Sequence, residues 1–155
     1  MMNIQKLAPY RESITGVLLV AREAAMAPIR PVLRSSNFTE QQWRVLRVLS
    51  DEGPLDIAAL CTKAVLHGPS ISRILKELSD RGLISREADA QDRRRFFVDI
   101  TSEGRLAIKK TATDTLVLLN KYVDAFGKER LENLLSELTA FSEELADFHP
   151  MDRTE

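Results

Sequence analysis

The chain has 155 residues, of which 44% are hydrophobic and 29% charged, an ordinary balance for a soluble globular protein. This length fits one domain, or one domain with an added dimerisation element. The single cysteine, Cys61, excludes an intrachain disulfide framework. No apolar run approaches the ~18 residues that span a bilayer, and the first residues lack the pattern of a signal peptide. We therefore expect a cytoplasmic protein that does not enter a membrane.

Charge is distributed unevenly, although the whole chain carries a formal charge of only −1. Residues 63–95 have a net balance of +3, whereas residues 124–155 have one of −6. A basic middle beside an acidic end indicates that only the middle of the chain meets a polyanion such as nucleic acid.

The apolar pattern predicts three helices in the first part of the chain. Residues 3–27 carry one apolar face at spacings of three and four, and Pro28 and Pro31 then break the pattern. Residues 39–51 begin with Thr39 and Gln42, which have the offset of a capping box, and end before a Gly-Pro pair. A short helix is expected at about residues 56–64.

A helix and a hairpin follow. The helix is expected to begin at Pro69, because proline suits a first helical position, and to end at Gly82. Its buried stripe consists of Ile71, Ile74, Leu75 and Leu78. Residues 83–88 and 95–101 have the pattern of strands, with a hairpin tip at residues 89–94. The residues of the second strand expected to anchor the hairpin are Phe96, Val98 and Ile100.

Two long helices complete the chain. Thr101 is placed to cap a helix that runs to about residue 126, and Gly127 separates it from a last helix at about residues 128–148. We expect a mainly α fold with a small β-hairpin wing, in which residues 37–102 form a winged helix-turn-helix domain. The apolar faces of the outer helices, in residues 1–36 and 103–155, are too long for this domain to cover. We therefore expect them to form a homodimer.

Two motifs resemble the MarR family of bacterial transcription regulators, and the resemblance covers essentially the whole chain. One is LSDRGLI at residues 78–84. The other is the wing motif, which at the family's spacing comprises Asp92, Arg94, Val98, Ile100, Thr101 and Gly104. In addition, TEQQWRVLRVLS at residues 39–50 is similar to the subgroup that controls aromatic-acid catabolism, such as repressors of homoprotocatechuate degradation. The resemblance implies a dimeric DNA-binding regulator, most often a repressor, that responds to a small aromatic acid.

The polar face of the helix after residue 68 is expected to enter the major groove of an imperfectly palindromic operator in double-stranded DNA. The residues on this face are Pro69, Ser70, Ser72, Arg73 and Lys76. We expect Arg73 to contact a base, for example guanine, and Lys76 to contact a phosphate. Taken without the neighbouring hairpin, the same residues would be read as an ordinary solvated helix face.

The hairpin tip carries Arg93, Arg94 and Arg95. A narrow minor groove concentrates negative potential and attracts an inserted arginine. By the resemblance, Arg94 occupies the wing-tip position, and Asp92 would hold it by a bidentate pair. Arg93 and Arg95 are then expected to contact phosphates. The alternative is a solvated arginine cluster.

In the MarR family, small anionic aromatic ligands often bind between the dimerisation helices and the DNA-binding lobe. By that resemblance the candidate effector residues are Tyr10, Arg11, Ser13, Trp43 and Arg44. An arginine suits a carboxylate, and an aromatic side chain suits a phenyl ring. In the alternative interpretation, Trp43 belongs to the core and Arg11 makes a surface or interface ion pair.

Other functions receive less support from the sequence. Cys61 is expected to pack, although a redox-sensing role is the alternative. His67 is a candidate for capping the next helix or touching a phosphate, and no residues have metal-ligand spacing, so neither metal nor cofactor is expected. Nothing resembles a catalytic constellation, which argues against an enzyme. The alternatives that stay open are a MarR-type regulator of drug efflux or stress genes, and a winged-helix protein-interaction module that does not bind DNA.

Overall fold

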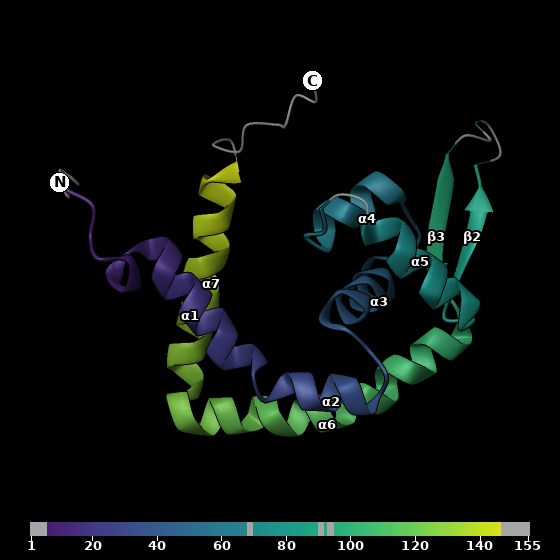
Figure 1. Ribbon diagram of the computed structural model, residues 1–155. Coiled ribbons are helices and arrows are strands. Elements are labelled where there is room, and N and C mark those ends of the chain that lie inside the picture. The colour runs from purple at the N-terminus through teal and green to yellow at the C-terminus, as the bar shows by residue number, and fades with distance from the viewer. Residues whose placement is uncertain (1–5, 68–69, 90–91, 93–94, 147–155) are drawn as a thin grey trace. The chain divides into compact units, whose positions relative to one another are not determined.

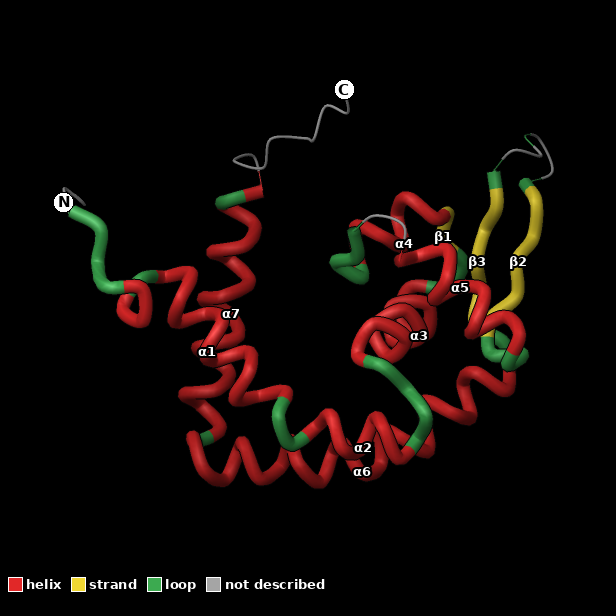
Figure 2. Tube along the Cα trace, viewed as in Figure 1, coloured by secondary structure: helices red, strands yellow, loops and turns green. Residues whose placement is uncertain are grey.

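The computed structural model describes residues 6–67, 70–89, 92 and 95–146 (Figure 1). The chain divides into two compact units, Met1–Thr115 and Leu116–Glu155, which are described separately. The described residues are mainly helical and include one small antiparallel sheet (Figure 2), which confirms the predicted fold class. Among them, no helix combines the length and apolar character needed to cross a membrane.

The N-terminal segment differs from the single helix predicted at residues 3–27. A 3-10 turn, η1, spans Tyr10–Glu12, and helix α1 begins only at Ile14 and ends at Met26. A further helix, α2, spans Ile29–Ser35, where no helix was predicted. Pro31 lies in the first turn of α2, where a backbone N–H has no acceptor within the helix, so the helix tolerates the proline.

Three helices form the core of the first unit. They are α3 (Glu40–Glu52), α4 (Ile57–Lys63) and α5 (Ser70–Asp80), close to the predicted ranges. The capping box is present: the Gln42 N–H donates to Thr39 Oγ1, and the Thr39 N–H donates to Gln42 Oε1. The apolar residues that these helices bury completely are Val45, Leu46, Leu49, Leu60, Leu75 and Leu78.

The sheet has three strands in the order β1-β3-β2. Strands β2 (Ile84–Ala88) and β3 (Phe96–Ile100) form the predicted hairpin, and β1 (Leu55–Asp56) pairs with the other edge of β3. The two residues of β1 are too few to show an alternating pattern, which explains why the sequence analysis missed this strand.

One expectation about the hairpin is wrong. Val98 and Ile100 are buried as predicted, but 44% of Phe96 is exposed. Strand β1 reaches only as far as Asp56, which lies opposite Phe97. Phe96 is therefore paired only with Ala88 of β2 and lies beyond the end of β1. Phe96 alternates with Val98 and Ile100 as predicted, but it lies beyond the part of the sheet that is covered.

Two long helices follow the sheet. Helix α6 spans Ser102–Phe126, and α7 spans Lys128–Glu144. The predicted cap of α6 is present, because Thr101 Oγ1 accepts from the Gly104 N–H at 3.1 Å and donates to the Gly82 carbonyl at 2.7 Å. The boundary between the two units falls within α6, so the division into three parts made from the sequence stays a prediction.

The outer helices expose many large apolar side chains. In α1, α6 and α7 these include Ile14, Val17, Leu19, Val20, Leu116, Val117, Leu119, Leu134, Leu135 and Phe141. Large exposed apolar faces mark interaction surfaces.

Candidate nucleic-acid interface

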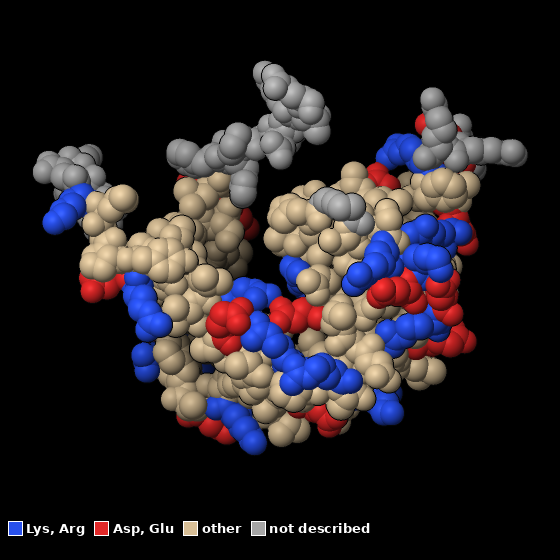
Figure 3. All heavy atoms as spheres, in the orientation of Figure 1, with Lys and Arg blue, Asp and Glu red and all other residues tan. Residues whose placement is uncertain are grey.

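Helix α5 separates an apolar face from a polar one. Ile71, Ile74, Leu75 and Leu78 are buried, as predicted. The opposite face exposes four of the predicted DNA-contacting residues, namely Ser70, Ser72, Arg73 and Lys76. Lysine and arginine side chains gather over α5 and the neighbouring strands, with acidic side chains between them (Figure 3). Pro69, the remaining residue predicted on this face, lies outside the described residues.

The two cations of α5 are paired within the helix. Arg73 Nε lies 3.3 Å from Glu77 Oε1, and Lys76 Nζ lies 2.6 Å from Asp80 Oδ2. The hydrogen bond from Lys76 to Asp80 raises the pKa of the lysine, which keeps it charged. Both side chains are mostly exposed, at 82% for Arg73 and 73% for Lys76. Such exposed pairs contribute little, so a polyanion can replace the carboxylates.

A partly buried set of hydrogen bonds joins α5 to α3. Gln42 is only 5% exposed, and its Nε2 donates to Glu77 Oε2 at 2.8 Å. Its Oε1 meanwhile accepts from the Thr39 N–H at 3.0 Å. Glu77 therefore joins the capping box of α3 to Arg73, the residue expected to contact a base. Local sequence patterns cannot predict this contact, because Gln42 and Glu77 are 35 positions apart.

The hairpin near its tip is tied to the helical core. Arg95 Nη2 donates to Asp56 Oδ2 at 2.8 Å, so the arginine expected to contact phosphate has an acidic partner. The Arg95 N–H donates to the Asp92 carbonyl at 2.9 Å, and the Asp92 N–H donates to Asp89 Oδ1 at 3.1 Å. Arg93 and Arg94 lie outside the described residues, and so does the expected pairing of Asp92 with Arg94.

The candidate effector residues fall into two groups. Tyr10 and Arg11 are exposed in η1, and Ser13 caps α1 by accepting the Gly16 N–H at 3.1 Å. Trp43 is 8% exposed, and its ring centroid lies 6.2 Å from that of Phe38. In the described part of the chain, no hydrogen bond or ring contact joins the first group to Trp43 or Arg44.

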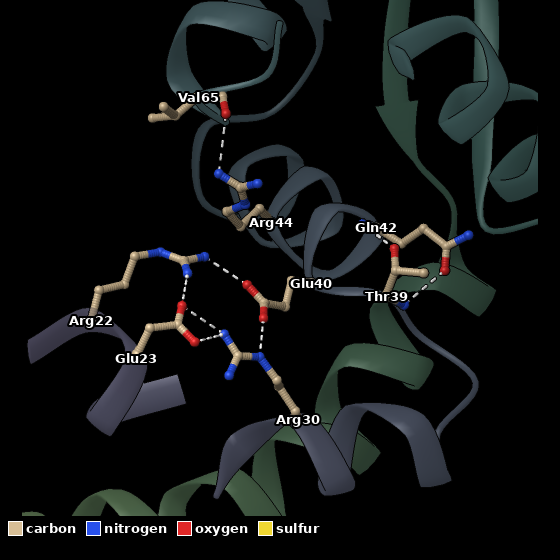
Figure 4. A network of polar contacts seen from close by, with 8 residues as sticks. All are labelled: Arg22, Glu23, Arg30, Thr39, Glu40, Gln42, Arg44 and Val65. Atoms are coloured by element: carbon tan, nitrogen blue, oxygen red, sulfur yellow. Dashed lines mark hydrogen bonds and ion pairs between the residues drawn. The ribbon is translucent and has the colours of Figure 1, made fainter. Parts of the chain in front are cut away.

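Arg44 has an unusual environment. Its Nη1 donates to the Val65 carbonyl at 3.1 Å, whereas its Nε is buried and has no hydrogen-bond partner among the described residues (Figure 4). Buried polar groups without partners are rare in folded proteins. Arg47, which the sequence analysis did not single out, lies with its guanidinium carbon 5.9 Å from the Trp43 ring centroid.

Four charged residues link the N-terminal helices to α3 (Figure 4). Glu40, the first residue of α3, accepts from Arg22 of α1 at 2.6 Å and also from Arg30 of α2. Glu23 completes the ring by accepting from both arginines, at 3.0 and 2.8 Å. Burial of Glu40 favours its neutral form, but the hydrogen bonds from Arg30 and Arg22 outweigh this and lower its pKa. The sequence shows no periodic signal for contacts so far apart.

The reactive and metal-binding side chains in the described part of the chain do not form a catalytic or metal site. Cys61 is partly covered, and burial raises the pKa of its thiol, which disfavours the reactive thiolate. Among the residues that the structure describes, no three His, Cys, Asp or Glu side chains come together as metal ligands. His67 is exposed just before the undescribed residues 68–69.

Comparison with known proteins shows similarity over most of the chain. Residues 36–95 match a family model described as "MarR family". The HTH-type transcriptional regulator FarR of Neisseria gonorrhoeae is 35% identical over 136 residues, covering 86% of this chain and 93% of FarR. The homoprotocatechuate degradative operon repressor of Escherichia coli is 32% identical over 130 residues, covering 84% of this chain and 88% of the repressor. NadR, whose crystal structure was solved in complex with 4-hydroxyphenylacetate, is 35% identical in sequence. That structure has a TM-score of 0.73 and matches 89% of this chain and 97% of the NadR chain.

Proposed function

This chain belongs to the MarR family of transcriptional regulators, and we propose that it is a homodimeric repressor released from its operator by a small aromatic acid. The observation that carries the proposal is the polar face of α5, which exposes Ser70, Ser72, Arg73 and Lys76 beside the β2–β3 hairpin. A single exposed helix of this kind fits the major groove of duplex DNA.

The roles proposed for this face follow from side-chain chemistry. Arg73 carries a planar fork that can bond two acceptors of a guanine at once. Lys76 and the two serines suit phosphate, and Lys76 would exchange Asp80 for a DNA oxygen. The hairpin would place Arg94 in the minor groove, with Arg93 and Arg95 on the backbone and Asp92 and Pro69 as supporting contacts.

The proposed dimer uses the exposed apolar faces of the outer helices. A twofold dimer presents two α5 helices, so the operator should contain two copies of one half-site in inverted orientation. The centres of the two half-sites should lie about one helical turn of DNA apart, roughly 10 base pairs. An imperfect palindrome is therefore the expected target.

An aromatic acid is the proposed effector class. NadR, with which this chain shares 35% identity, was crystallised with 4-hydroxyphenylacetate. The Nε of Arg44, which has no hydrogen-bond partner among the described residues, supplies a donor for a carboxylate, and the ring of Trp43, the preceding residue in the chain, suits a phenyl group. Tyr10, Arg11 and Ser13 would complete the site. The effector must bind more tightly to a form whose α5 helices do not match the operator, because release requires such a difference in affinity.

Selection of binding sites from a random pool of duplex DNA tests the DNA contact without knowledge of the operator. We expect the sequences recovered to share an imperfect palindrome, and their affinity to fall steeply as salt rises, because bound phosphates release counterions. Recovery of no common sequence, together with no salt-dependent binding to any duplex, would leave a protein-interaction module as the better account.

Calorimetry with 4-hydroxyphenylacetate and its uncharged amide tests the effector site. We expect the acid to bind the full chain and the amide to bind at least about tenfold more weakly, because a charge-assisted hydrogen bond is lost. Arg44→Gln should remove the preference for the acid, and Arg11→Ala tests the contribution of η1. Equal affinity for acid and amide in the unaltered chain would contradict the proposed carboxylate contact.

A further inference from the structure

A polar cavity of about 220 Å³ lies in the first unit and shares no lining residue with the groups proposed to bind DNA or effector. It is formed by the segment between α2 and α3, the residue that follows α5, and the first half of α6. Figure 1 labels these helices. The residues that determine its chemistry are Ser36, Asn37, Arg81, Lys110 and Thr111. We propose that this cavity binds a small oxyanion, such as the phosphate group of a free metabolite.

Two cations line the cavity, and none of the described residues that line it is acidic. Arg81 is held in place, because its Nη1 donates to the Asn37 carbonyl at 2.8 Å and its guanidinium carbon lies 4.7 Å from the Phe38 ring centroid. These contacts leave other guanidinium N–H groups for a ligand. The Lys110 side chain makes no hydrogen bond or ion pair with any other residue that the structure describes. A fixed guanidinium and an unpaired ammonium group that line the same cavity are well suited to phosphate oxygens.

The carbonyl groups that would repel an anion here already have donors. The C-terminal end of a helix carries partial negative charge, and α2 ends beside the cavity. The carbonyls of Val32 and Leu33 both accept from the Ser36 N–H, and that of Arg34 accepts from the Asn37 N–H. The Asn37 carbonyl accepts from Arg81. These four carbonyl groups therefore already accept hydrogen bonds, which weakens their repulsion of an anion.

The polar lining favours a hydrophilic anion over an aromatic acid. Apart from Phe38 and Ala107, the cavity presents hydroxyl, amide and cationic groups. It shares no residue with the exposed face of α5 or with the proposed effector site. A bound phosphate would bridge the α2–α3 segment, the end of α5 and α6, all within the unit Met1–Thr115. The ligand would thus stabilise the position of α5 relative to α6.

The only tryptophan in the chain reports on this cavity. Phe38 lines the cavity, and its ring centroid lies 6.2 Å from that of Trp43. Titration of the full chain with inorganic phosphate, at constant ionic strength set with chloride, can therefore be followed by tryptophan fluorescence, with calorimetry as a second readout. No DNA or aromatic acid is needed, so this test can fail while the proposed function stands.

Lys110 and its neighbour Lys109 provide a matched pair of variants. Both are exposed on α6, but only Lys110 lines the cavity. We expect saturable phosphate binding that Lys110→Gln weakens by about fivefold, near the upper end for one exposed charge contact. Lys109→Gln should bind like the unaltered chain, and Lys110→Arg should retain binding. Absence of saturable binding, or equal weakening by Lys109→Gln and Lys110→Gln, would overturn the proposal.

A DNA-binding measurement distinguishes two possible sources of the bound phosphate group, a free compound and the backbone of the operator. We expect Lys110→Gln to bind duplex DNA as tightly as Lys109→Gln does, because the cavity is distinct from the α5 face. A selective loss of DNA affinity in Lys110→Gln would assign Lys110 to the DNA backbone and would overturn the assignment to a free ligand.

Discussion

Arg95, immediately before β3, donates to Asp56, the N-cap of α4, with 2.8 Å between Nη2 and Oδ2. The other oxygen of the same carboxylate accepts the Ala59 N–H at 2.8 Å and so caps α4. The hydrogen bond from Ala59, followed by that from Arg95, lowers the pKa of Asp56. One carboxylate therefore joins the hairpin to the helix that precedes α5.

Two substitutions separate the cap from the ion pair. Asp56→Asn keeps an oxygen that can cap α4 but loses the charge opposite Arg95, whereas Asp56→Ala loses both. We expect urea unfolding to show a small loss of stability for the asparagine variant and a larger one for alanine. Equal stability of the alanine variant and the unaltered chain would mean that neither contact of Asp56 supports the fold.

Gln42 should be required for stability because it is buried and hydrogen-bonded at both ends of its amide. Gln42→Leu keeps a similar volume but removes the hydrogen bonds to the Thr39 N–H and to Glu77 Oε2. We expect a loss of about 1–3 kcal/mol in the free energy of unfolding, because two hydrogen bonds of roughly 0.5–1.5 kcal/mol each are lost. Gln41→Leu, on the exposed neighbouring position, is the control. A neutral Gln42→Leu would show that water replaces the lost contacts.

Glu40 should make the stability of the chain depend on pH. Its pKa is lowered in the folded protein by Arg30 and Arg22 in spite of its burial. A carboxyl group with a lowered folded-state pKa stabilises the fold above its unfolded value, about 4.3, and this contribution is lost as pH falls through the folded value.

Unfolding measurements on the unaltered chain and on Glu40→Gln test this linkage. The difference in stability between the two should be largest near neutral pH and should shrink as the pH falls below about 4. A difference that stays constant from pH 7 to pH 3 would mean that the charge of Glu40 adds nothing to the ring of four residues.

Gly104 allows α6 to start close to the hairpin. A Cβ atom at this position would lie 2.2 Å from the Leu83 carbonyl oxygen and 2.6 Å from Ile100 Cγ1. We expect Gly104→Ala to lower the free energy of unfolding by about 1–3 kcal/mol, as overpacking of a close contact does. Glu103→Ala, at an exposed neighbouring position, should change little. A stabilised alanine variant would contradict this tight approach.

Periodic elements were predictable from the sequence, whereas contacts made by distant residues were not. The ranges of α3 and α5 and the cap at Thr101 follow from apolar spacing and local capping chemistry, which depend on residues a few positions apart. Helix α2 is not predictable from the proline pattern, because Pro31 can break a helix but also fits the first turn, where it lies here. Phe96 was misassigned because alternation does not tell where β1 ends.

The same contrast between periodic elements and contacts of distant residues applies to the candidate site. The exposed face of α5 follows from the helical period alone, so its residues were found. The partners Glu77 and Asp56, and the ring around Glu40, depend on how separate elements pack. Whether Trp43 and Arg44 meet Tyr10, Arg11 and Ser13 depends in the same way on packing, and this part of the effector site stays a prediction.

Lys76 and Arg73 should contribute differently to DNA binding. Lys76→Ala should weaken binding to all duplexes alike and reduce the salt dependence of log K by about one unit, as loss of one phosphate contact does. Lys128→Ala on α7 removes a positive charge elsewhere and is the control. If Lys76→Ala changed sequence preference without changing the salt dependence, Lys76 would contact a base instead.

The most direct test is fluorescence anisotropy of Arg73→Ala on the selected palindrome and on a scrambled duplex of equal length. The account predicts that the variant, folded like the unaltered chain, loses about 1–3 kcal/mol on the palindrome, or roughly 5- to 150-fold in affinity, and much less on the scrambled duplex. An Arg73→Ala protein that binds the palindrome as tightly and as selectively as the unaltered chain would contradict the assignment of α5 as the helix that reads DNA.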